Sequence, residues 1–363
     1  MTTFGSAIIR SGCASVGCLR TGMAIAATGG LTAGPVAAHE AWLLTPSEIE
    51  RLALAPMPAL FTSMWALGLA SAIGGALAFG ALRIERATRA AEARLMGPAA
   101  AAAPPLGALA VRLGLAAMLA LAAVGGLPRH GTLPWAEPTF LVPDMPLGLA
   151  PGWEWLALAQ AILAASLAVG FLTRLCGMAV VALALLGLAV FGPAFLAYAP
   201  HFAAPGLLLA IVGGGTASLD HALRVEPWLR PGKDVAAAAW AGSMALIGGG
   251  FVYLAVTFKL MQPTLIMEIL DKGEVPLLGV PLAVAALAMA GVEIIAGTLF
   301  AVGRLTRPVA LFLIGAFTFF AVTLGETPLF HANLYGAMAL FVLAGRTCPA
   351  PQREVGGMQA VTA

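Results

Sequence analysis

The stretch that decides the fold is Ala168-Val169-Gly170-Phe171-Leu172-Thr173-Arg174, because a near copy, Ala301-Val302-Gly303-Arg304-Leu305-Thr306-Arg307, follows later in the chain. Six of the seven positions agree. A histidine follows each copy: His201 lies 27 residues after Arg174, and His331 lies 24 residues after Arg307. Each histidine is followed by glycine at the fifth and at the fourteenth position. This shared spacing indicates that one unit occurs twice, as in the internal repeats of many membrane proteins.

The composition of the chain indicates whether this unit lies in water or in a membrane. Of 363 residues, 60% are hydrophobic and only 10% are charged. A water-soluble core cannot hide that much apolar surface, so we predict an all-α, polytopic bundle of transmembrane helices in a lipid bilayer. The net charge of +2 gives no reason to expect nucleic-acid binding. The four cysteines form no Cys-x-x-Cys motif, which argues against a thiol relay.

The first 38 residues have the pattern of a signal peptide. Two arginines precede the apolar run 23–31, and small residues at Val36-Ala37-Ala38 suit a signal peptidase. Cleavage there would leave His39 as the mature N-terminus. The alternative is an uncleaved anchor helix.

Residues 39–105 are expected to hold a periplasmic segment, one transmembrane helix and a cytoplasmic linker. The periplasmic segment includes a short amphipathic stretch from Pro46 to Leu54. Thr45 or Ser47 could cap this stretch, with acidic residues in its first turn.

Eight or nine apolar spans follow, at about 57–82, 106–127, 151–172, 177–196, 203–219, 235–258, 281–303, 309–325 and 331–345. Outside the signal segment, thirteen Lys/Arg fall on one side of these spans and four on the other. The positive-inside rule then places the mature N-terminus outside and the C-terminus in the cytoplasm.

The spans divide into two parallel four-helix repeats, 106–220 and 235–346, with a cytoplasmic tail at 347–363. Four spans are an even number, so both repeats enter the bilayer from the same side. We expect Gly170, Gly303 and the run Gly248-Gly249-Gly250 to allow close packing of the helices.

Glu293 is the most informative single residue, because it lies near the middle of a predicted span. An ionisable group at that depth is costly unless it is paired or neutral, so it is a functional candidate. Its counterpart in the first repeat is Gln160. The two residues suggest a shared internal site. The alternative is a protonated glutamate that holds two helices together.

A polar cluster is predicted at the outer mouth of this site. The last span is short, so the turn before it should dip below the surface, and it carries Glu326, His331 and Asn333. The matching turn of the first repeat carries His201. These groups could pass protons, hold a quinone head group or bind a metal. Alternatively, the two histidines could simply bond to loop carbonyl groups.

Copper binding depends on His39. If the signal segment is removed, the α-amino group and the imidazole of His39 form a chelating pair that suits copper(II). No second histidine lies nearby in the sequence.

The segment 248–263, in which an apolar helix ends in Lys259-Leu260 before a polar-proline turn, resembles the first helix of DoxX-like membrane proteins. The Gly-x-Leu-Thr-Arg turn and the short fourth helix are similar to that family too. The resemblance is clearest over 235–346 and weaker over 106–220. It implies a bacterial inner-membrane protein linked to quinone or sulfur redox chemistry. It supplies no catalytic residue for this chain.

Two hypotheses about function follow from these observations. The first is a membrane subunit of a quinone- or sulfur-linked redox system, in which Glu293, Glu326 and His331 line a quinone or proton site. Such a subunit would work with a periplasmic or membrane redox partner. The second is a non-enzymatic transporter or copper-handling protein. A third possibility is an assembly factor whose partner holds all the cofactors.

Overall fold

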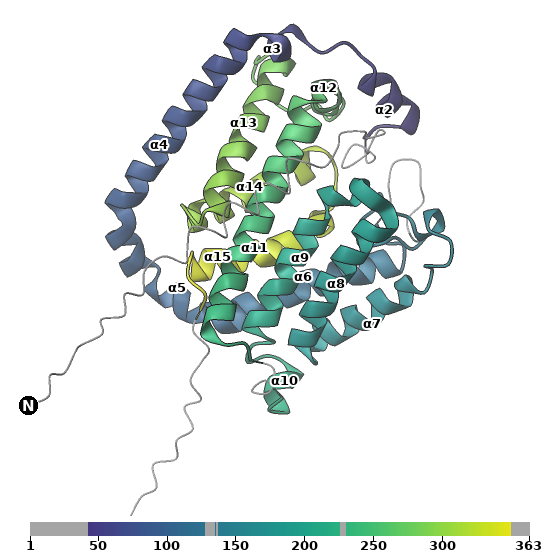
Figure 1. Cartoon of the computed structure of the whole chain (residues 1–363), viewed down its shortest axis with the longest axis vertical. Helices are drawn as coiled ribbons and strands as arrows, with labels where there is room; N and C mark the ends of the chain where they lie inside the picture. Colours follow the sequence, from purple (N-terminus) through teal and green to yellow (C-terminus); the bar gives the residue numbers. More distant parts are fainter. Residues whose placement is uncertain (1–42, 128–134, 136, 226–229, 350–363) are drawn as a thin grey trace, which may run out of the picture. The chain divides into compact units, whose positions relative to one another are not determined.

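The computed structural model describes residues 43–127, 135, 137–225 and 230–349 (Figure 1). Within these ranges the regular structure is helical, apart from one isolated antiparallel bridge between Thr139 and Pro146. The all-α prediction is therefore confirmed for the described part of the chain. The predicted signal segment, His39 and the tail from residue 350 onward lie outside the described residues.

Each predicted span overlaps a helix, with differences at the ends. These helices are α4 (Met64–Leu95), α6 (Ala108–Ala123), α7 (Leu156–Val169), α8 (Thr173–Phe191), α9 (Ala199–Val212), α11 (Lys233–Leu254), α13 (Leu282–Ala301), α14 (Thr306–Thr323) and α15 (Ala332–Ala344). Among the described residues, six helical stretches are long and apolar enough to cross a membrane, while α7, α9 and α15 belong to shorter apolar stretches. This set of helices fits a multi-pass integral membrane protein.

Several helices are longer than their apolar segments. The first span was predicted to end at residue 82, but α4 continues to Leu95 because residues 83–95 are rich in Ala, Arg and Glu, which favour helix. The predicted linker before α6 is also helical, as α5 (Gly97–Ala102) and a π-helical segment, Ala103–Gly107. A second π-helical segment, Ala255–Leu260, extends α11.

Both copies of the seven-residue stretch fold into the same turn. The first joins α7 to α8 and the second joins α13 to α14. In each, the glycine has a positive φ, 72° at Gly170 and 66° at Gly303, and so does the leucine two residues later, 48° at Leu172 and 49° at Leu305. The bonds match too: Phe171 N–H to Ser166 C=O (2.8 Å), Gly170 N–H to Leu167 C=O (3.1 Å), Arg304 N–H to Leu299 C=O (2.7 Å) and Gly303 N–H to Phe300 C=O (2.9 Å). This pattern is the Schellman motif, which suits glycine.

The structure corrects part of the prediction about glycine packing. Gly170 and Gly303 both suit the turn through their positive φ. Gly170 also packs closely as predicted, since an added Cβ would overlap the guanidinium group of Arg112, whereas at Gly303 an added Cβ would lie 3.5 Å from Met244, which is an ordinary contact. Gly248 does pack closely, since an added Cβ would lie 2.2 Å from the carbonyl oxygen of Gly297 on α13. By contrast, an added Cβ at Gly249 would meet open space.

The first helix of each predicted repeat lies against the last helix of the other. Helix α6 packs on α15, and α11 packs on α9. The approach is close at the first contact, where an added Cβ at Gly114 would lie 2.1 Å from the carbonyl oxygen of Ala332. The starts of α9 and α15 are therefore enclosed by helices of both halves.

The arginine that ends each copy of the turn caps the C-terminal end of a short helix. Arg174 donates hydrogen bonds to the last carbonyl groups of α9, and Arg307 does the same for α15. The acceptors are Ala210 (2.8 Å), Ile211 (2.5 Å), Val342 (3.0 Å), Leu343 (3.1 Å) and Ala344 (3.2 Å). These bonds satisfy carbonyl groups that a helix end otherwise leaves unpaired.

The short amphipathic helix predicted near residue 46 is confirmed as α2 (Pro46–Ala53). Thr45 caps it in a capping box with Glu48, and Leu52 packs with residues of α12 (Pro263–Lys272) in one apolar cluster. Lys272 lies 2.5 Å from Glu48. The hydrogen bond from Lys272, together with those from Thr45, lowers the pKa of Glu48 to about 2.

Candidate functional site

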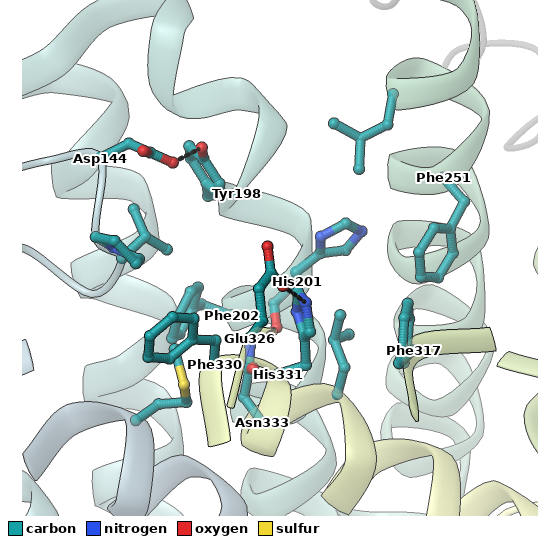
Figure 2. Close-up of a pocket in the computed structure, with 15 residues that line it drawn as sticks. Asp144, Tyr198, His201, Phe202, Phe251, Phe317, Glu326, Phe330, His331 and Asn333 are labelled. Carbon is teal, nitrogen blue, oxygen red and sulfur yellow. Dashed lines mark hydrogen bonds and ion pairs between the residues drawn. The ribbon is translucent and has the colours of Figure 1, made fainter. Parts of the chain in front are cut away.

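A cavity of about 80 Å³ lies where α9 and α15 begin, and it is lined from both halves of the chain (Figure 2). Its lining is mostly apolar, with two imidazoles, two carboxyl groups, one phenol and one amide. The lining residues are Met118, Val142, Pro143, Asp144, Tyr198, His201, Phe202, Phe251, Leu254, Phe317, Glu326, Phe330, His331, Asn333 and Leu334. An apolar pocket with a few convergent polar groups is the usual form of a small-molecule site.

Two phenyl rings connect the two histidines of the cavity. The centroid of the His201 ring lies 5.0 Å from that of Phe251, and the Phe251 ring lies 5.7 Å from that of Phe317. Phe317 in turn stacks on His331, with centroids 5.3 Å apart. Figure 2 shows Phe251 and Phe317 one above the other, on one side of the imidazoles. The row of rings, in which neighbouring planes are tilted by 24° to 36°, packs against both imidazoles.

Carboxyl groups lie beside the polar groups of the cavity. Glu326 is 3.8 Å from the Nε2 atom of His331. The hydroxyl group of Tyr198 donates a hydrogen bond to Asp144. Figure 2 shows these two pairs at separate places in the cavity. Each pair joins a proton donor to a proton acceptor, so both can take part in proton transfer.

Asn333 links the starts of α9 and α15. Its side-chain amide donates a hydrogen bond of 2.8 Å to the backbone carbonyl of His201, and the residue is buried. The bond fixes the backbone that carries His201 relative to α15. Asn333 therefore positions one half of the cavity against the other.

Gly250 on α11 makes room for the ring of His201. An added Cβ at Gly250 would lie 2.6 Å from the Nε2 atom of His201. A methyl group there would displace the imidazole. The glycine run 248–250, which was expected to allow close helix packing, thus also shapes the cavity.

Four of the predicted site residues lie together in this cavity, namely His201, Glu326, His331 and Asn333. Tyr198 could have been found from the sequence, because it lies in the same turn as His201, three residues earlier. Phe251 and Phe317 carried no signal, because apolar helix residues are common throughout such a chain. Asp144 carried none because it lies in the loop before α7, away from both copies of the turn.

Gln160 lies outside the lining of the cavity. It is fully buried, its amide group donates to the carbonyl of Thr139 (2.9 Å), and its side-chain oxygen accepts from the N–H of Leu141 (2.8 Å). These bonds hold the loop that brings Val142 and Asp144 to the cavity. Gln160 is thus a positioning residue for that loop.

Glu293 also lies outside the lining, and it forms an ion pair with Lys259. Lys259 belongs to the π-helical end of α11, and π-helical turns often occur at functional sites. The side chain of Glu293 is 25% exposed and that of Lys259 is 15% exposed. The glutamate predicted to be costly in a membrane is therefore paired with a lysine. The cavity and this ion pair are two separate features.

The described residues contain no group of three or more His, Cys, Asp and Glu that could hold a metal ion. His39, the predicted copper ligand, lies outside the described residues. His221 is exposed in α10 (Leu219–Ala222), which follows α9, whereas the cavity lies at the start of α9.

Comparison of the chain with known protein families, curated proteins and solved structures finds no match. Its function must therefore be argued from the cavity itself.

Proposed function

We propose that this chain consists of two DoxX-like four-helix units and is the membrane subunit of a quinone-linked redox system. In this proposal the cavity at the starts of α9 and α15 binds the quinone head group on the periplasmic side of a bacterial inner membrane. The observation that carries the proposal is the position of His201 and His331. They follow the two copies of the turn at similar spacing, and they line one cavity.

Three features support a duplicated unit. The two turns share their backbone conformation, and Arg174 and Arg307 cap the C-terminal ends of α9 and α15. In addition, α6 of the first unit packs on α15 of the second, and α11 of the second unit packs on α9 of the first. The predicted orientation is supported by the positions of the described Lys and Arg residues. Arg174 and Arg307, for example, bond to the last carbonyl groups of α9 and α15, at the opposite ends of these helices from the cavity.

The cavity has the groups that a quinone head group requires. Quinones carry two electrons and two protons between redox partners. Imidazole N–H groups can donate hydrogen bonds to carbonyl oxygens, and the Glu326–His331 pair can take or give a proton. Phe251 and Phe317 offer flat apolar surfaces to a ring.

Size limits how such a ring can bind. The cavity of about 80 Å³ is roughly half of the 150 Å³ that admits benzene in an engineered protein cavity. A quinone ring therefore requires some of the lining side chains to move, or it occupies the cavity only in part. Hence we expect quinones with few ring substituents to bind more tightly than heavily substituted ones.

Binding of a short-chain quinone to the purified full-length protein tests the proposal. His201→Ala and His331→Ala should each weaken binding about fivefold, because each removes one hydrogen bond. His221→Ala, the matched control, should leave the affinity unchanged, and Gly250→Ala should weaken binding by displacing His201. Equal affinities of the wild type and both cavity variants would refute the proposal.

Glu293→Gln separates the cavity from the ion pair. Because Glu293 does not line the cavity, this change should leave the quinone affinity unchanged. If Glu293 carries protons for the same reaction, the change should lower quinone-dependent activity. Unchanged activity would remove Glu293 from the mechanism while leaving the cavity in it.

Copper handling is the second candidate function. One observation favours it: two imidazoles and the thioether of Met118 line the same cavity. Imidazole and thioether ligands together suit copper(I). Metal analysis of the purified protein distinguishes the two functions. Bound copper that is lost in the His201→Ala and His331→Ala variants would favour this second function.

A further inference from the structure

Helix α4 is longer than a membrane requires. Its 32 residues span about 48 Å, whereas the hydrocarbon layer is about 30 Å thick. The apolar part ends at Leu82, and residues 83–95 add about 20 Å of charged helix. Arg83 is the first residue after the apolar part, and its guanidinium group lies 5.0 Å from the centre of the Phe79 ring. The first charged turn is therefore at the depth of the lipid head groups.

The charges on this part of α4 are divided between two faces. Glu85 is buried and lies 3.4 Å from Arg304, and Glu92 lies 2.8 Å from Arg307. Both acidic side chains thus face the turn between α13 and α14. Arg83 and Arg86 are exposed and adjacent on the helix surface. The face of α4 that carries them is left with positive charge.

We propose that Arg83 and Arg86 bind the phosphate groups of anionic phospholipids. The guanidinium group matches a phosphate with two parallel hydrogen bonds. The head-group layer is about 5–7 Å thick on each side of a bilayer, and Arg86 lies about 4.5 Å of helix rise beyond Arg83. Both arginines are therefore within this layer. A soluble acidic protein reaches this depth less readily than a lipid does.

Arg94 provides an internal control for depth. It is exposed like Arg86, but it lies about 16 Å of helix rise beyond Arg83. That distance exceeds the screening length of about 8 Å at physiological salt. Arg94 should therefore contribute little to lipid binding, although its charge is the same.

The test titrates phosphatidylglycerol into the purified full-length protein in detergent, with phosphatidylcholine as the neutral lipid. Bound lipid is counted by native mass spectrometry. We expect the wild type to prefer phosphatidylglycerol. Each of Arg83→Gln and Arg86→Gln should weaken that binding about fivefold, and the double variant about 25-fold, since a basic residue near an anionic surface contributes about 1 kcal/mol.

The single variant Arg94→Gln is the control of equal charge for each single variant, and it should bind phosphatidylglycerol like the wild type. The exchanged residues are exposed, so these variants should keep the unfolding temperature of the wild type. Two results would overturn the proposal. One is equal binding of the two lipids by the wild type, which would favour an acidic protein as the partner of the arginines. The other is an equal loss of binding in Arg94→Gln and in the two single variants Arg83→Gln and Arg86→Gln.

Discussion

The two copies of the turn have one backbone conformation but different partners. In the first copy, Asp220 accepts hydrogen bonds from the N–H groups of Leu172 (2.6 Å) and Thr173 (2.7 Å). In the second copy, Glu85 of α4 lies 3.4 Å from the N–H of Leu305. A carboxylate caps the following helix in both cases. The first turn is capped by Asp220 of α10, which follows α9, and the second is capped by Glu85 of α4.

This difference shows what the duplicated sequence specifies. The shared residues determine the turn and the arginine that closes the short helix. The caps lie outside the copied stretch, and they differ between the two turns. Because α4 supplies the second cap and also pairs with Arg307, α4 depends on the second turn for its position.

The largest loss of stability is expected for Asp220→Ala, which removes the cap of the first turn. Glu85→Ala, which removes the cap of the second turn, is compared with it. Asp220 is buried and accepts short hydrogen bonds from the N–H groups of Leu172 and Thr173, so Asp220→Ala leaves two backbone donors without their acceptor. We expect a loss of about 2–5 kcal/mol in unfolding free energy. Glu85→Ala should cost only about 1 kcal/mol, because its bonds are longer and Arg304 is 39% exposed.

Unfolding of the purified variants in one detergent measures both losses. Asp220→Asn keeps one acceptor oxygen and should fall between the wild type and Asp220→Ala. A larger loss of unfolding free energy in Glu85→Ala than in Asp220→Ala would contradict this prediction, because the cap of the second turn would then stabilise the protein more.

A smaller effect is expected at the glycine contacts, which also differ between the halves. Gly177 on α8 lies against Gly206 on α9, with an added Cβ only 2.6 Å from the Gly206 carbonyl oxygen. By the register of Arg174 and Arg307, its counterpart in the second half is Ala310. Gly177→Ala should therefore destabilise the protein by about 1–3 kcal/mol, even though the second half has alanine at this position.

Gly249→Ala is the control for that variant, since an added Cβ there meets open space. It should leave the stability unchanged or raise it by up to about 1 kcal/mol, because alanine favours helix over glycine. Thermal unfolding distinguishes the two substitutions. Equal stability of both variants would mean that α8 and α9 can move apart without cost.

The smallest effect is expected at Glu48, a carboxylate cap that lies outside both turns and is more exposed than Asp220. Its pKa is lowered to about 2 from 4.5, so the ion pair with Lys272 stabilises the folded state above about pH 4.5. This contribution should be lost as the pH falls through 2. The stability difference between the wild type and Glu48→Gln, measured against pH, checks this. A difference that does not change between pH 5 and pH 2 would contradict it.

The sequence predicted the helices and four residues of the cavity, because apolar runs and a repeated spacing are visible in a single chain. His201 and His331 could be matched since each follows a copy of the turn. Glu293 and Gln160 could be matched by register as well, but they lie outside the cavity lining. Depth along a helix does not determine which way a side chain points. The partners of Glu293 and Gln160 come from segments far away in the sequence, which periodicity cannot reveal.

The short length of α9 and α15 has a consequence for the electrostatic potential in the cavity. Both helices begin at the cavity and run away from it, so the positive ends of two helix dipoles face its interior. Among the described residues, the lining contains no lysine or arginine, but it does contain the carboxyl groups of Asp144 and Glu326. The positive helix ends therefore offset negative charge on these carboxyl groups with backbone groups that cannot move away, and no cationic side chain has to be buried for that purpose.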